Sequence, residues 1–141
     1  MSKRICLIRV FLATVLMSFC CISMVCYAAE PNPHTPTVQY SYYNMNTSGN
    51  TAWRDKFSIY TDVYVNPTEG PTLIYTVQGA NSSSSSTGVN RSTPIQISAG
   101  EKRGISNDFI QSLEVYARLN LQRTVAGQVY TKGWWNPDAE Y

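Results

Sequence analysis

The chain has 141 residues and a formal net charge of +2 at pH 7, with 43% hydrophobic and 12% aromatic residues. This length corresponds to one domain, and the small net charge gives no support to nucleic acid as a partner. All four cysteines lie before residue 27, so the rest of the chain can form no disulfide framework and offers no cysteine nucleophile.

Residues 1–28 are predicted to form a cleavable signal peptide. Lys3 and Arg4 give a basic start, an apolar stretch follows from about Ile5 to Val25, and Ala28 is a small residue at its end. These are the three parts of a Sec-type export signal. An uncleaved membrane anchor is the alternative, because the apolar stretch approaches the roughly 20 residues that cross a bilayer. Cleavage after Ala28 predicts a secreted, extracellular product that does not span the membrane.

Removal of this segment changes the charge of the product. Eight Lys and Arg then stand against nine Asp and Glu, a formal charge of −1. Neither nucleic acid nor an anionic membrane surface is therefore an expected partner. Residues 29–37 contain three prolines and are predicted to form an extended leader, so that residues 38–141 are the folded domain.

Alternation of apolar and polar residues predicts strands throughout the domain, because side chains point to opposite faces of a strand in turn. The expected strands, in chain order, are 38–44, 56–65, 72–80, 94–98, 112–122 and 128–135. The two clearest are 56–65, with Phe57, Ile59, Thr61, Val63 and Val65 on one face, and 112–122, with Leu113, Val115, Ala117, Leu119 and Leu121 on one face. A helix would scatter these leucines around its axis.

Turn-forming residues predict how these strands pair. Residues 66–71 are expected to join 56–65 to 72–80 as a hairpin, and residues 123–128 to join the last two strands in the same way. Residues 81–93, rich in serine, threonine and asparagine, are predicted to be a mobile loop or a long hairpin tip, residues 99–107 a turn, and 105–110 a short helical turn. The predicted fold is all-β, an antiparallel β-sandwich or small barrel of about six or seven strands.

The sequence offers little for catalysis. His34 is the only histidine and lies in the leader, and no serine-nucleophile or phosphate-binding glycine motif occurs. Asp62 and Glu114 could form the carboxylate pair of a glycan hydrolase. Asn136, Asp138 and Glu140 alternate oxygen ligands but lack the glycine of a calcium loop. No enzyme activity, metal or cofactor is predicted.

The aromatic residues carry the prediction of a binding site. Tyr60, Tyr64 and Tyr116 alternate with the apolar positions and are expected on the solvent face of the sheet, with Asp62 and Arg118 as polar contacts. Of the adjacent Trp134 and Trp135, one is expected to face outward and join the ligand site, and the other to fill the core. Tyrosine offers a flat apolar face and a hydroxyl at little entropic cost. Ordinary cross-strand packing of the rings is the alternative.

Three functions follow as hypotheses. The first is a secreted recognition module for a glycan or protein ligand on a cell surface. The second is a secreted bacteriocin or toxin-like antibacterial protein, suggested by small size and the polar 81–93 loop. The third is a small carboxylate-dependent glycan hydrolase. The sequence makes no prediction about oligomeric state.

Overall fold

A computed structural model describes residues 29–33 and 36–140, except for the side chains of Tyr43, Asn44 and Glu140. The signal peptide predicted over 1–28 and His34 lie outside these residues. The described chain forms the strands β1 (Glu30–Pro31), β2 (Val38–Met45), β3 (Ser48–Asn50), β4 (Arg54–Asp55), β5 (Val63–Glu69), β6 (Leu73–Ala80), β7 (Val89–Asn90), β8 (Ile95–Ile97), β9 (Arg103–Ile105), β10 (Tyr116–Arg123), β11 (Val129–Asn136) and β12 (Ala139–Glu140), and the 3-10 helix η1 (Phe109–Gln111).

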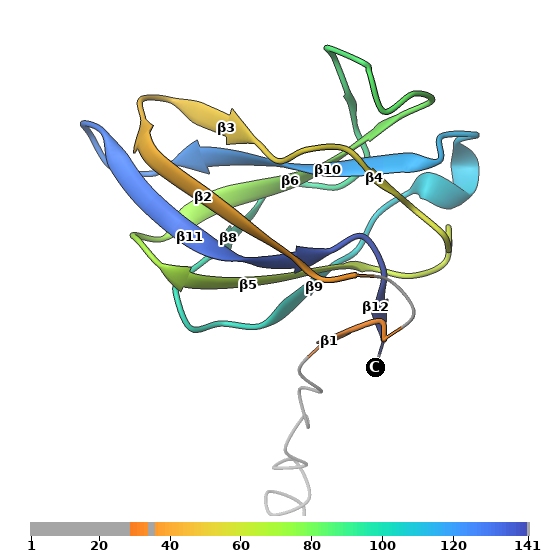
Figure 1. The fold of residues 1–141 in the computed structure, drawn as a ribbon, viewed down its shortest axis with the longest axis horizontal. Helices are drawn as coiled ribbons and strands as arrows, with labels where there is room; N and C mark the ends of the chain where they lie inside the picture. Colours follow the sequence, from red (N-terminus) through yellow and green to blue (C-terminus); the bar gives the residue numbers. More distant parts are fainter. Residues whose placement is uncertain (1–28, 34–35, 141) are drawn as a thin grey trace, which may run out of the picture.

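Two antiparallel sheets lie one over the other, as expected for a β-sandwich (Figure 1). The larger sheet has the order β3-β10-β6-β7, with β4 also paired to β10 and β8 to β6. The smaller sheet has the order β2-β11-β5-β9, and β1 pairs with β12 as a separate ribbon. The prediction of an all-β, antiparallel fold is confirmed. No helix in the described part of the chain is long and apolar enough to cross a membrane.

The core lies between the two sheets and is built from the central strands. The side chains that are at most 1% exposed there include Val63, Val65, Leu73, Tyr75, Val77, Leu119, Leu121 and Trp135. The apolar face predicted for residues 117–121 is therefore confirmed. The predicted division of the two tryptophans is also confirmed, since Trp135 is 1% exposed and Trp134 is 41% exposed.

The predicted hairpins are wrong. β5 continues through Glu69, and the chain turns at Gly70, where φ is 113°, to enter the other sheet as β6. β10 and β11, expected to pair across residues 123–128, also belong to different sheets. Alternation of apolar and polar residues shows which face of a strand is buried. Two strands show the same alternation whether they pair side by side in one sheet or pack face to face from two sheets, so the pattern cannot distinguish these arrangements.

The two clearest predicted strands begin later than expected. β5 begins at Val63 and β10 at Tyr116, so Phe57 and Leu113, expected to face inward, are 73% and 94% exposed. Residues 56–62 form a loop because Asp138 takes the N–H groups of Phe57 and Ser58, which a strand would direct to a neighbouring strand. The four weaker predictions are confirmed to within one or two residues as β2, β6, β8 and β11.

Two short strands lie in the regions between the predicted strands. β7 lies within residues 81–93 and pairs antiparallel with β6, which agrees with the hairpin tip expected there, whereas β9 lies within the predicted turn 99–107 and pairs with β5. The helical turn expected at 105–110 is η1, shifted toward the C-terminus. These short strands widen both sheets at one edge.

Candidate functional site

The structure does not bring the three predicted tyrosines together. Tyr64, in β5, is 3% exposed and packs with Ala29 and Ala139, so the β1–β12 ribbon covers it. Tyr60 lies in the loop before β5 and is 79% exposed, while Tyr116 lies in β10 of the larger sheet. The expectation of one solvent-exposed tyrosine face is therefore wrong. The chain's own terminal segments cover the outer side of β5, which alternation within β5 could not indicate.

The other predicted ligand-binding residues are also dispersed. Arg118 lies in β10 near Tyr116, and its guanidinium carbon is 4.3 Å from the centre of the Trp53 ring. Its Nε donates to Gln78 Oε1 at 2.9 Å, and the residue is 9% exposed. Trp134 lies on the smaller sheet, and Asp62 accepts from the Ala139 N–H at 2.8 Å through its backbone carbonyl. Arg118 is thus held by neighbours within the protein.

The carboxylate considered for hydrolysis has a structural partner. Arg91 donates to Glu114 through Nε at 2.6 Å and Nη2 at 2.9 Å, and Glu114 is 7% exposed. The carboxylate lies against Gly79, where a Cβ atom would collide with it. In the described part of the chain, no group of three or more His, Cys, Asp or Glu is placed to hold a metal ion.

The edge strands β2 and β3 of the two sheets lie close together on one side of the sandwich (Figure 1). Residues of both strands line a cleft there. Its volume is about 280 Å³, and we call it the edge cleft. The residues that line it are Val38, Gln39, Tyr40, Ser41, Tyr42, Asn50, Thr51, Ala52, Arg54 and Trp135. Aromatic rings thus meet amide, hydroxyl and guanidinium groups at one opening.

Two glycines make room for the tyrosines of the edge cleft. Tyr40 and Tyr42 alternate along β2 and both pack toward the core. A Cβ atom at Gly49 would lie 2.8 Å from the Tyr42 ring, and one at Gly133 would lie 2.6 Å from Tyr40 Oη. Such distances are shorter than carbon contacts allow. The rings can therefore lie across their neighbouring strands because those positions lack side chains.

The phenols of Tyr40 and Tyr42, which line the edge cleft, and of Tyr75, which is bonded to Tyr40, are held in their neutral form. Tyr40 Oη and Tyr75 Oη are 2.9 Å apart, a hydrogen bond that joins the two sheets. Burial raises the pKa of Tyr40 and of Tyr75, and it raises the pKa of Tyr42 to about 12. At physiological pH these hydroxyl groups can donate or accept hydrogen bonds but do not act as phenolate nucleophiles.

Arg54 supplies the charge of the edge cleft. Its backbone is fixed by pairing with Ala117 in β10. Within the described chain, neither the Arg54 guanidinium nor the Tyr42 hydroxyl has a hydrogen-bond or ion-pair partner. Among the described residues that line the cleft there is no carboxylate or imidazole. The arrangement is therefore suited to binding a polar ligand with an acidic group.

Sequence reasoning missed the edge cleft. The alternate tyrosines at positions 40 and 42 were visible in the expected strand 38–44, but Arg54 lies in another sheet. Glycines at 49 and 133 were the available signal that large rings lie nearby. Comparison of the chain with protein-family models, curated proteins and solved structures finds no match.

Proposed function

We propose that the chain is an exported recognition module that binds a saccharide bearing an acidic group in the edge cleft, and that it is not an enzyme. The observation that carries this proposal is that Arg54, whose guanidinium has no ion-pair partner among the described residues, lines the same cleft as the half-buried Tyr42 ring, together with amides and hydroxyls. The signal peptide expected over 1–28 supports export. The proposed binding site lies apart from Tyr60, Tyr64 and Tyr116, which the sequence suggested.

The chemistry of the lining fits such a ligand. A sugar ring has apolar C–H faces that pack on an aromatic ring, and hydroxyls that exchange hydrogen bonds with Asn50 and Ser41. Arg54 can form two parallel hydrogen bonds with a carboxylate, sulfate or phosphate group. The volume of about 280 Å³ lies at the lower end of small-molecule sites, and it suits one or two sugar residues rather than a long chain.

A glycan array that contains matched neutral and uronic-acid saccharides tests this proposal. The secreted form should bind acidic members, and calorimetry on a binding saccharide should show at least about tenfold weaker affinity for Arg54→Gln, since a charge-assisted hydrogen bond contributes about 1.5–3 kcal/mol. Tyr42→Ala should weaken binding to acidic and neutral saccharides alike.

Arg103→Gln is the matched control, because Arg103 is an exposed arginine on β9, outside the edge cleft. It should bind like the wild type. An array without binding, or equal affinities for Arg54→Gln and the wild type, would remove the edge cleft as a saccharide site.

A second candidate is the antibacterial or toxin-like function, which one observation favours. Phe57, Tyr60 and Leu113 are 73%, 79% and 94% exposed. They lie on two loops joined by the hydrogen bond from Lys56 N–H to the Val115 carbonyl at 2.8 Å. Large apolar side chains that project from adjoining loops are typical of surfaces that contact a target.

Purified protein added to bacterial cultures and to phosphatidylcholine vesicles tests this second candidate. Growth inhibition or dye release that is lost in Phe57→Ser/Leu113→Ser would support it. Growing cultures and intact vesicles would exclude it. No observation favours the hydrolase, since Arg91 already binds the Glu114 carboxylate.

A further inference from the structure

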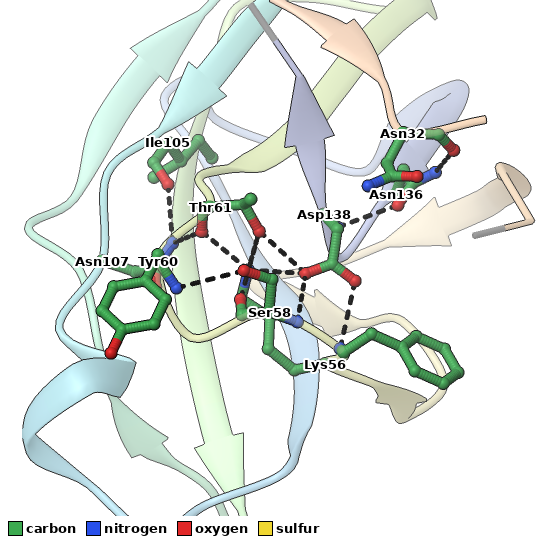
Figure 2. Close-up of polar contacts among 10 residues, drawn as sticks. Asn32, Lys56, Ser58, Tyr60, Thr61, Ile105, Asn107, Asn136 and Asp138 are labelled. Atoms are coloured by element: carbon green, nitrogen blue, oxygen red, sulfur yellow. Dashed lines mark hydrogen bonds and ion pairs between the residues drawn. The ribbon is translucent and has the colours of Figure 1, made fainter. Parts of the chain in front are cut away.

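A buried ion pair joins the loop before β5 to the segment after β11. Lys56 Nζ lies 3.0 Å from Asp138 Oδ1, and the two side chains are 0% and 1% exposed. Figure 2 shows the Asp138 carboxylate surrounded by donors from the loop that contains Lys56, Ser58 and Thr61. We call this group the Lys56–Asp138 cluster. It connects residues that are 82 positions apart in the chain.

Neighbouring groups hold Lys56 Nζ and the Asp138 carboxylate in place. The Asp138 N–H donates to Asn136 Oδ1 at 2.8 Å, which orients the residue after β11. Lys56 Nζ donates to the Thr61 carbonyl at 2.7 Å and lies 5.9 Å from the centre of the Phe109 ring. An amine and a carboxyl group are therefore held in contact away from solvent, and fixed proximity of this kind favours reaction between them.

The hydrogen bonds to Asp138 resemble those that assist acyl transfer. The Phe57 N–H donates to Oδ2 at 3.1 Å, and the Ser58 N–H donates to Oδ1 at 3.1 Å. Backbone N–H groups aimed at carboxyl oxygens stabilise the negative charge that develops when a nucleophile adds to the carbon. Burial lowers the pKa of Lys56, which favours the neutral amine that such an addition requires.

We propose that the side chains of Lys56 and Asp138 condense to an intramolecular isopeptide bond. The bond from Lys56 Nζ to Asp138 Cγ forms, and the bond from Cγ to Oδ1 breaks. Two protons pass from Nζ to Oδ1, which leaves as water, so the ammonium and carboxylate become a neutral amide. The reaction consumes no oxidant, reductant or other reactant.

Thr61 provides the path for proton transfer. Lys56 Nζ donates to Thr61 Oγ1 at 2.9 Å, and Thr61 Oγ1 donates to Asp138 Oδ1 at 2.8 Å. The hydroxyl thus accepts from the nucleophile and donates to the oxygen that leaves. This is the direction in which protons must move in the condensation.

The bond would give this domain a covalent link that cysteine cannot supply. All four cysteines lie before residue 27, so the described residues contain none. An amide between Lys56 and Asp138 would close a loop of 82 residues and restrict the unfolded chain, as a disulfide does. Unlike a disulfide, it would resist reduction.

Mass spectrometry of the denatured, purified wild-type protein tests the proposal. We expect a mass lower than that of the chain by one water molecule, counted from its determined N-terminus. Trypsin should fail to cut after Lys56, and tandem spectra should show a branched peptide that joins Lys56 to Asp138. The full mass, with ordinary tryptic cleavage after Lys56, would overturn the proposal.

Two variants separate the bond from other losses of water. Lys56→Arg keeps a positive charge beside Asp138 but has a weakly nucleophilic guanidinium, so it should retain the full mass. Loss of water in this variant would mean a succinimide at Asp138 and would contradict the link. Thr61→Val should accumulate unlinked protein over time, and unchanged linkage in it would exclude the proton path. Saccharide binding at the edge cleft does not enter these measurements.

Discussion

The edge cleft and the Lys56–Asp138 cluster use similar residues in opposite ways. Both place a cation and hydroxyl groups beside an aromatic ring. In the cluster, Asp138 accepts hydrogen bonds from Lys56, Thr61 and two backbone N–H groups, and its side chain is 1% exposed. In the edge cleft, the Arg54 guanidinium and the Tyr42 hydroxyl have no hydrogen-bond or ion-pair partner among the described residues.

This difference separates groups that hold the fold from groups available to a ligand. Buried polar groups are costly unless each is hydrogen-bonded, so a fully bonded cluster is a structural or reactive unit of the protein itself. A charged group at an open cleft can remain solvated until a ligand replaces the water. Substitutions in the cluster should therefore change mainly the free energy of unfolding, and removal of Arg54 or Tyr42 side-chain groups from the edge cleft should change mainly the affinity for a ligand.

The largest effect is expected for Asp138→Ala. This change removes the proposed amide link and the hydrogen bonds that Asp138 accepts, and it leaves the buried Lys56 amine without its partner. Loss of a buried ion pair alone costs about 3–5 kcal/mol. The free energy of unfolding, measured with urea, should fall by that amount or more. Lys132→Ala, which breaks an exposed ion pair with Glu69, should change it far less. Equal losses for the two variants would show that the cluster does not hold the fold.

Gly133→Ala is expected to have the next largest effect. Its Cβ would lie 2.6 Å from the Asn66 carbonyl oxygen and 2.8 Å from Pro67 Cα, which are backbone atoms that cannot move aside easily. Overpacking of this kind costs about 1–3 kcal/mol. Thermal unfolding should show the loss.

Gly49→Ala provides the comparison for Gly133→Ala. A Cβ there meets only the ring of Tyr42 among its nearest atoms, and a ring can shift. This variant should lose less stability but bind an acidic saccharide more weakly. Similar stabilities of the two variants would mean that the backbone of Asn66 and Pro67 shifts as easily as the Tyr42 ring.

The sequence identified strands better than it identified their neighbours. Burial of Ala117, Leu119 and Leu121 follows from a period of two, which is a property of a single strand. Which sheet receives β6 depends on how the chain turns near Gly70, and both a hairpin and a crossing between sheets satisfy the same alternation. The pattern therefore predicted the all-β class but not the strand order.

The edge cleft could not be found by the same reasoning. Tyr42 and Arg54 belong to edge strands of different sheets, so their meeting depends on how the sheets are layered. Tyr64 was misplaced for a similar reason, since the β1–β12 ribbon that covers it comes from both ends of the described chain. Local alternation contains no information about such long-range cover.

A smaller effect is expected for Trp53→Ala, which removes one of the neighbours of the Arg118 guanidinium. The Trp53 ring lies 4.3 Å from the guanidinium carbon of Arg118, and its Nε1 donates to the Ser85 carbonyl at 2.7 Å. Losing both contacts should cost about 1–2 kcal/mol in urea unfolding. Trp53→Phe keeps the stacking and should lose about half as much. A loss of saccharide affinity in either variant would show that the binding surface extends beyond the edge cleft.

The smallest effect at neutral pH is expected for Tyr42→Phe, because the hydroxyl that it removes has no hydrogen-bond partner among the described residues. Alkaline pH should reveal a difference. Burial raises the pKa of Tyr42 from about 10 to about 12, so its neutral form is favoured in the folded state. The resulting stability is fully present below pH 10 and is lost as the pH rises toward 12, where the unfolded state has already released its proton.

Urea unfolding of the wild type and Tyr42→Phe at several pH values measures this difference. Both proteins should lose stability above pH 10, since burial also raises the pKa of Tyr40 and Tyr75. The loss should be less steep in Tyr42→Phe, which has one fewer buried phenol to ionise. Parallel curves for the two proteins would mean that the Tyr42 hydroxyl is already solvated in the edge cleft. In that case, a ligand would have to displace ordered water from Tyr42 as well as from Arg54.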